Sequence, residues 1–223
     1  MADTAKIIEL RQLLRERFPA AHTPRAPSVD CWLTGIPSLD DAGVPKGGLT
    51  ELVCPARSGG SALLLHALVE RQVEQGHLPA LIDGRNSFDP ASLPVNTRQR
   101  LLWIRCQNAR ESVQVADLLL RDGNLPFVLL DLQFNPPRES RRLPAAAWFR
   151  LQGLANRSGA VCLILTPSPM VGSAQLRLTL NSLLRIESLE RTESGIRQDI
   201  HLEINRRRAD TRESGVPLRR LAG

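Results

Sequence analysis

The feature that most constrains the fold is the stretch over residues 50–61, where a short extended segment over residues 49–53 runs into a loop of small residues. A run of helix formers follows, and its pattern predicts a helix over residues 61–75 that stops before Gly76. A strand, a loop and a helix N-terminus in this order bring backbone N–H groups and the helix dipole to one point. The stretch therefore predicts a phosphate-binding loop or its remnant.

The loop departs from the phosphate-loop pattern G-x-x-x-x-G-K-[ST] at the position of the lysine. Cys54 stands for the first glycine, and Gly60 occupies the lysine position. A bound triphosphate without that lysine loses a charge-assisted contact of ~2–3 kcal/mol. We expect a nucleotide-binding fold that has lost, or nearly lost, its ATPase chemistry. The loop residues assigned to this remnant are Cys54, Arg57, Ser58, Gly59, Gly60 and Ser61.

A plain turn before a helix is the alternative interpretation of the same residues. Ser61 follows two glycines, and a serine at a helix N-cap accepts hydrogen bonds from the free N–H groups of the first turn. The loop alone does not decide between the two interpretations.

Strand and helix patterns alternate along the chain. Helices are also expected over residues 112–121 and 143–156, and two further strands, at 183–191 and 198–206, form a hairpin around residues 192–195. The sequence thus predicts an α/β fold with a doubly wound, largely parallel sheet and C-terminal antiparallel strands. The strands of the sheet are expected at residues 49–53, 78–82, 101–106, 127–131 and 161–165.

An N-terminal amphipathic helix is expected over residues 4–18, before a proline-containing linker. One stripe of this helix is apolar, and we expect it to pack on the body of the protein or to dock a partner. The stripe consists of Ile7, Leu10, Leu14 and Phe18. The expected organisation is the helix and linker over residues 1–29, a core over 30–210 and a basic tail over 211–223.

Composition excludes several classes of protein. No apolar run is long enough to cross a bilayer, and the charged N-terminus is unlike a signal peptide, so we expect a cytoplasmic protein without a membrane partner. The four cysteines are dispersed and form no C-x-x-C pair, which gives a zinc site no support. No metal site and no catalytic residue is assigned.

The order of motifs around the loop resembles the opening of the RecA/RadA-like recombinase core. The motifs are Thr-Gly-Ile-Pro at residues 34–37, Pro-Lys-Gly-Gly at 45–48, and the stretch with Phe-Asp-Pro at 81–90. The resemblance implies that Ser61 and Asp131 hold Mg²⁺, although an acid that ends a strand is also ordinary. It also implies that Arg85 replaces the water-activating glutamate, and that Thr166 and Pro167 replace the polar pair that senses the γ-phosphate.

The short chain and the altered positions resemble one family in particular, the RecA-related ImuA proteins of bacterial mutagenesis cassettes. The segments that carry this likeness are residues 101–106, 116–120, 143–152 and 165–169. The resemblance implies a role in damage-induced translesion DNA synthesis. The partners it implies are a Y-family-polymerase-like ImuB and an error-prone replicative-type DNA polymerase, with RecA and DNA as further candidates.

Two groups of arginines are candidate contacts with DNA or with a neighbouring subunit. The net charge is +6, and arginine supplies nearly all of the positive charge. A solvated helix face and a basic tail are the alternative interpretations. The residues are Arg141, Arg142, Arg206, Arg207 and Arg208.

The sequence leads to three functional hypotheses. The first is a non-hydrolysing RecA-like accessory protein that acts by binding polymerase partners, with weak ATP and Mg²⁺ binding at most. The second is a DNA-dependent ATPase in which Arg57 or Arg85 compensates for the missing lysine. The third is a SulA-like inhibitor of cell division.

Overall fold

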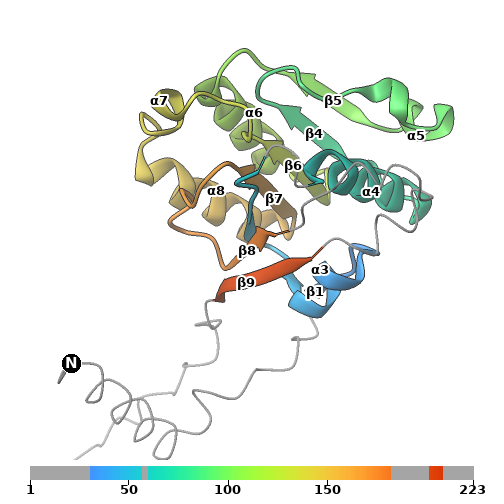
Figure 1. Ribbon diagram of the computed structural model, residues 1–223, viewed down its shortest axis with the longest axis horizontal. Helices are drawn as coiled ribbons and strands as arrows, with labels where there is room; N and C mark the ends of the chain where they lie inside the picture. Colours follow the sequence, from blue (N-terminus) through green and yellow to red (C-terminus); the bar gives the residue numbers. More distant parts are fainter. Residues whose placement is uncertain (1–30, 57–59, 182–200, 208–223) are drawn as a thin grey trace, which may run out of the picture.

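A seven-stranded sheet forms the centre of the protein in the computed structural model, which describes residues 31–56, 60–181 and 201–207 (Figure 1). Along the sheet the strand order is β5-β4-β6-β7-β3-β8-β9. All neighbouring pairs are parallel except β8 and β9, which pair antiparallel. The expected α/β fold is therefore confirmed. The strands are β3 (Leu49–Val53), β4 (Ala80–Asp83), β5 (Leu102–Arg105), β6 (Phe127–Asp131), β7 (Val161–Thr166), β8 (Leu176–Leu180) and β9 (Leu202–Arg207).

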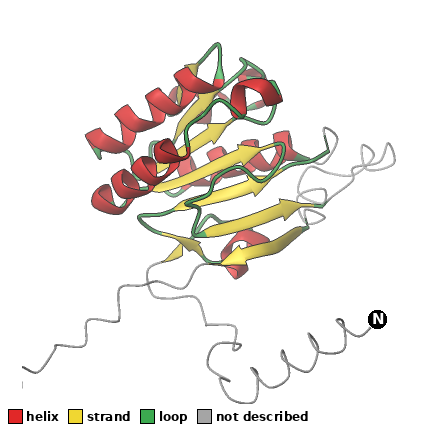
Figure 2. Ribbon diagram, turned by 90° about the vertical axis from the view of Figure 1, so that its left-hand side faces the viewer, coloured by secondary structure: helices red, strands yellow, loops and turns green. Residues whose placement is uncertain are grey.

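Helices cover both faces of this sheet (Figure 2). On one face, α3 and α4 enclose an apolar core, and on the other face α6 and α8 enclose a second one. A small antiparallel pair of β1 (Cys31–Trp32) and β2 (Val44–Pro45) precedes the sheet. The helices are α3 (Pro37–Ala42), α4 (Ser61–Glu74), α5 (Val95–Gln99), α6 (Ala109–Asp122), α7 (Pro137–Ser140) and α8 (Ala145–Ser158), with a 3₁₀ turn η1 (Pro90–Ser92).

Strand β6 is apolar up to its last residue, Asp131, because its side chains contribute to both cores. In β6, Phe127 and Leu129 face the core under α4, whereas Val128 and Leu130 face the core under α6 and α8. All four side chains are fully buried. Parallel strands covered on both faces carry this kind of continuous apolar run, which is why the sequence located β6 with its observed bounds. Strand β3 also has its expected bounds, although it contains the buried Thr50 and Glu51.

Helix α6 and strand β8 differ from the expectation for local reasons. Helix α6 begins at Ala109 rather than Ser112, because the side chain of Asn108 accepts a hydrogen bond from the N–H of Glu111 and so caps the helix. Strand β8 was not expected. Its leucines are buried and alternate with the half-buried Arg177 and Thr179, which is the period-two pattern of a strand.

Several expected segments lie outside the described residues. They include the N-terminal helix with Ile7, Leu10, Leu14 and Phe18, the strand over 183–191, the turn over 192–195 and the tail over 211–223. The second strand of the expected hairpin is present as β9, which pairs with β8. No helix among the described residues is long and apolar enough to cross a membrane.

Candidate functional site

The expected phosphate loop lies between the end of β3 and the start of α4. Cys54 is buried, and its backbone N–H donates to the carbonyl oxygen of Thr166 at 2.7 Å. Gly60 is the N-cap of α4 and has a left-handed backbone with φ +82°. Ser61 is the first residue of the helix and is buried. Arg57, Ser58 and Gly59 lie outside the described residues.

The interpretation of Ser61 as an N-cap serine is wrong. The cap position belongs to Gly60, and no side chain caps this helix. A glycine accommodates the left-handed conformation without a Cβ clash, so the glycine serves the backbone path of the loop. The strand–loop–helix order expected of a phosphate site is present.

Asp131 ends β6 beside this loop, at the edge formed by the carboxyl ends of the parallel strands. It is 4% exposed, and its Oδ1 accepts from the N–H of Gln133 at 2.9 Å. Burial raises the pKa of Asp131 to about 6, and the charge of Asp83 adds to this effect. Burial, followed by the charge of Asp131, raises the pKa of the Cys54 thiol to about 12. The structure thus brings Cys54 and Asp131 together from distant parts of the sequence.

Asp83 ends β4 directly opposite Asp131, and it holds the following loop in place. Its carboxylate accepts from the N–H groups of Arg85, Ser87 and Phe88. The indole N–H of Trp103 also donates to it, at 3.3 Å. These donors come from the following loop and from β5. Donors at every side of the carboxylate make Asp83 a loop anchor.

Gly84 follows Asp83 at a point where a side chain has no room. A Cβ there would lie 2.6 Å from the carbonyl oxygen of Asp131. The buried Asn135 donates from Nδ2 to the carbonyl oxygen of Gly84 at 3.0 Å. The turn after β4 and the turn after β6 are therefore packed directly on each other.

Arg85, at the position implied for the water-activating glutamate, binds other parts of the chain. Its Nη1 donates to the carbonyl oxygen of Gln107 at 3.0 Å and lies 3.9 Å from Oε1 of Glu139. Oε2 of Glu139 also accepts from the N–H of Ala109, at the N-terminus of α6. The guanidinium thus joins the turn after β4 to α7 and α6, and a guanidinium cannot act as a general base.

Thr166, at the position implied for the γ-phosphate sensor, is fully buried at the end of β7. Its hydroxyl donates to Oε1 of Glu51 at 3.1 Å. Glu51 lies in the middle of β3 and is itself fully buried. The sequence analysis missed Glu51, although a lone acid inside an apolar strand is a signal of a buried polar network.

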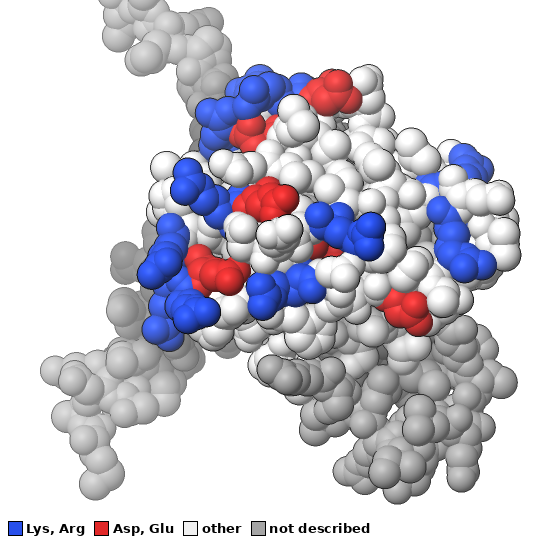
Figure 3. All heavy atoms as spheres, turned by 90° about the horizontal axis from the view of Figure 1, so that it is seen from above, with Lys and Arg blue, Asp and Glu red and all other residues white. Residues whose placement is uncertain are grey.

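The candidate arginines are found in two different settings. Arg141 and Arg142 follow α7 and are exposed, and Figure 3 shows positive side chains interspersed with acidic ones on the face seen from above. Arg206 donates to the carbonyl oxygen of Gly172 at 3.3 Å, and Arg207 donates to the carbonyl oxygen of Ala42. Arg208 lies outside the described residues. Contact of these arginines with DNA or a subunit stays a prediction.

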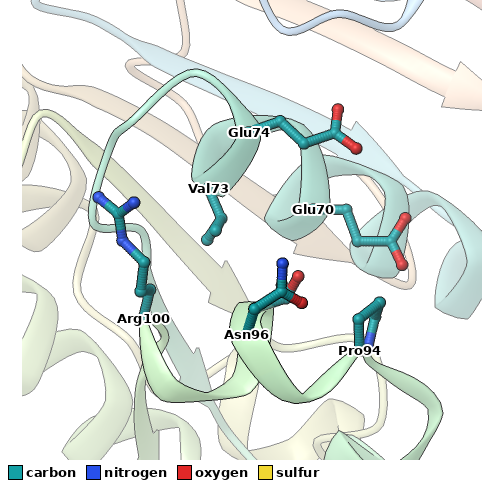
Figure 4. A pocket seen from close by; sticks show the side chains of 7 residues that line it. Glu70, Val73, Glu74, Pro94, Asn96 and Arg100 are labelled. Carbon is teal, nitrogen blue, oxygen red and sulfur yellow. The ribbon is translucent and has the colours of Figure 1, made fainter.

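A cavity of about 350 Å³ lies between the C-terminal half of α4 and α5 (Figure 4). Glu70 and Glu74 of α4 line it from one side, and Asn96 of α5 and Arg100 line it from the other. No described residue of the phosphate-loop remnant lines it. The full lining is Glu70, Val73, Glu74, Pro94, Asn96, Thr97 and Arg100.

Comparisons with known proteins show similarity to RecA proteins. The family model described as the RecA N-terminal domain matches residues 23–135. The chain is 29% identical over 153 residues to the protein RecA of Chlorobaculum tepidum, covering 59% of this chain and 44% of that protein. It is 30% identical over 158 residues to the protein RecA of Psychrobacter arcticus, covering 61% and 44%. The chain thus spans less than half the length of these relatives.

Among solved structures, a crystal structure of the RadB recombinase is similar at a TM-score of 0.49 and 17% sequence identity. The similarity covers 66% of this chain and 82% of that one.

Proposed function

Because the chain belongs to the family of the RecA N-terminal domain, we propose that it is a RecA-like accessory protein of the ImuA type that works by binding rather than by hydrolysis. Its role is in damage-induced translesion DNA synthesis. The partners are an ImuB-like Y-family polymerase homologue and an error-prone replicative-type polymerase, with RecA and DNA as further candidates. Such a role takes place in the cytoplasm.

One observation carries the proposal that ATP hydrolysis is lost. The described residues keep the order of strand β3, loop and helix α4, yet three of the implied working positions hold groups that serve the fold. Gly60 supplies a backbone turn in place of a lysine, Arg85 binds Gln107 and Glu139, and the Thr166 hydroxyl binds Glu51. These residues do not fit a hydrolytic site for ATP and Mg²⁺.

Ser61 and Asp131 are the remaining residues with the chemistry of such a site. One hydroxyl and one carboxylate contribute two oxygen ligands to Mg²⁺, which prefers six, so the cation would depend on nucleotide phosphates and water. Without the lysine those phosphates are held less firmly. This supports weak nucleotide binding at most.

A phosphate-release assay with single-stranded DNA tests the loss of hydrolysis. We expect the full chain and its Asp131→Ala variant to release phosphate at the same background rate. DNA-stimulated release that disappears in Asp131→Ala would establish the rival hypothesis of a DNA-dependent ATPase.

Co-purification with the ImuB-like protein tests the binding role. Leu10→Glu places a charge on the apolar stripe of the expected N-terminal helix, and we expect it to reduce capture of the partner at least about tenfold. Gln12→Glu adds the same charge on the opposite face of that helix and serves as the matched control. Equal capture by both variants would remove the helix from the docking surface, and no capture by the unaltered chain would refute the partner assignment.

A further inference from the structure

The connection between β7 and β8 is unusual for two strands on either side of a third. Both strands lie parallel to β3 and flank it, so residues 167–175 must return across one face of β3. Parallel crossovers generally take about a dozen residues or more and contain a helix, which satisfies its own backbone groups. This crossover contains no helix. Its N–H and C=O groups therefore need partners supplied from elsewhere.

Glu51, in the middle of β3, supplies the acceptor for two N–H groups of this crossover. Its Oε1 accepts from the backbone N–H of Met170 at 2.7 Å and of Val171 at 3.0 Å, in addition to the Thr166 hydroxyl. Val171 is fully buried in the core under α6 and α8. The carboxylate thus fixes the crossover at the point where it enters the core.

Arg177 completes the arrangement and offsets the buried charge. Its Nε donates to Oε2 of Glu51 at 2.5 Å, and its Nη2 donates to the carbonyl oxygen of Val171 at 3.1 Å. Arg206 lies opposite Arg177 in the β8–β9 pair and donates to Gly172 in the same crossover. The crossover is held from β3, β8 and β9 together.

We propose that Glu51 is a positioning residue that makes the crossover over residues 167–175 a fixed part of the core. Because Thr166 at the edge of the phosphate loop is bound to the same carboxylate, the crossover keeps one conformation whether or not a nucleotide is present. A ligand shifts a conformation only through a difference in its affinity for two states, and here the second state would break a buried ion pair. The inference does not rest on the choice of partner.

Hydrogen exchange of the full chain, read by mass spectrometry, tests this proposal. In the unaltered protein, the amides of Met170 and Val171 are expected to exchange at least about a hundredfold more slowly than in an unfolded peptide. Addition of ATPγS with Mg²⁺ is expected to leave this rate unchanged. Exchange at the unfolded rate, or a change confined to the crossover when ATPγS is added, would overturn the proposal.

Two variants separate a positioning role from general stability. Glu51→Gln removes the charge at constant shape, and we expect crossover amides to exchange at least about tenfold faster while those of β6 stay protected. Glu74→Gln, at an exposed carboxylate on α4 that pairs with Arg71, is the matched control and leaves the crossover unchanged. A folded Glu51→Gln protein with wild-type exchange in the crossover would contradict the proposal.

Thr166→Val keeps the proposal testable if Glu51→Gln does not fold. It removes one of the four hydrogen bonds to Glu51 without exposing a charge, and a smaller acceleration of about twofold to fivefold is expected in the crossover. An unchanged exchange rate in this variant would count against a carboxylate-centred anchor.

Discussion

Two carboxylates are buried at different places in the same sheet, and their surroundings differ. Glu51 in the middle of β3 accepts four hydrogen bonds and is paired with Arg177. Asp131 at the end of β6 accepts one backbone N–H, and the charge near it that raises its pKa is that of Asp83, another acid.

The difference distinguishes an acid that stabilises the fold from an acid that has few hydrogen-bond donors around it. A buried charge with donors on every oxygen and a cation beside it is a structural element, because removing any partner leaves a charge in the interior. A buried carboxylate whose ionisation is disfavoured is typical of sites where a ligand completes the environment. Asp131 therefore belongs to the proposed nucleotide site, whereas Glu51 stabilises the fold.

Removing the cation beside Glu51 should have the largest effect on stability. Arg177→Ala leaves the Glu51 carboxylate buried without its ion pair, and we expect the free energy of unfolding to fall by about 3–5 kcal/mol. Urea unfolding followed by circular dichroism measures this. Arg121→Ala removes an exposed partner of Asp117 and should cost less than about 1 kcal/mol. Similar losses of unfolding free energy in both variants would show that the ion pair of Glu51 contributes no more to stability than the surface pair of Asp117.

Neutralising Asp131 should increase the free energy of unfolding, and the size of the increase should depend on pH. Because the pKa of Asp131 is raised from 3.8 to about 6 in the folded protein, the folded state holds this proton more firmly than the unfolded state. The stability that this proton provides is present below pH ~4 and is lost as the pH rises through ~6.

Asp131→Asn should therefore stabilise the protein by about 2 kcal/mol at pH 7 and have little effect at pH 4. Urea midpoints measured between pH 4 and pH 7 for both proteins test this. A variant that is less stable than the unaltered chain at pH 7 would mean that neighbouring groups stabilise the charged form of Asp131, as they do for Glu51.

An acid at the surface should give the smallest effect and sets the baseline for the comparison. Asp117 on α6 pairs with Arg150 of α8 and with Arg121, and these partners lower its pKa, the Arg150 hydrogen bond most strongly. Asp117→Asn should cost less than about 1 kcal/mol near pH 7, less still at 1 M salt, and nothing once the pH has fallen through the lowered pKa. A salt-independent loss as large as that of Arg177→Ala would erase the distinction between surface and core.

Sequence patterns located much of the fold because burial on two faces leaves a local signature. The continuous apolar run of β6 and the helix formers after Gly60 needed no tertiary information. Strand β8 was not predicted, because its alternating pattern is short and contains Arg177, and the sequence does not show that this arginine pairs with the buried Glu51. The expected strand over 183–191 and the N-terminal helix lie outside the described residues and stay predictions.

The candidate site was predictable in its outline and not in its connections. The replacements at Gly60, Arg85 and Thr166 are visible in the sequence, as is the acid at Asp131. Their partners are distant in the chain: Arg85 meets Glu139, and Thr166 meets Glu51. A hydrogen bond between residues more than a hundred positions apart leaves no local pattern to detect.

The sequence by itself determined which elements form and which chemical groups are present or replaced at the phosphate loop, since these depend on local propensity and periodicity. Only the tertiary structure decided that Glu51 accepts several hydrogen bonds whereas Asp131 accepts few. The physical reason is that the energy of a buried charge is set by the dipoles and cations packed around it, and the sheet assembles these from strands that are far apart in the chain.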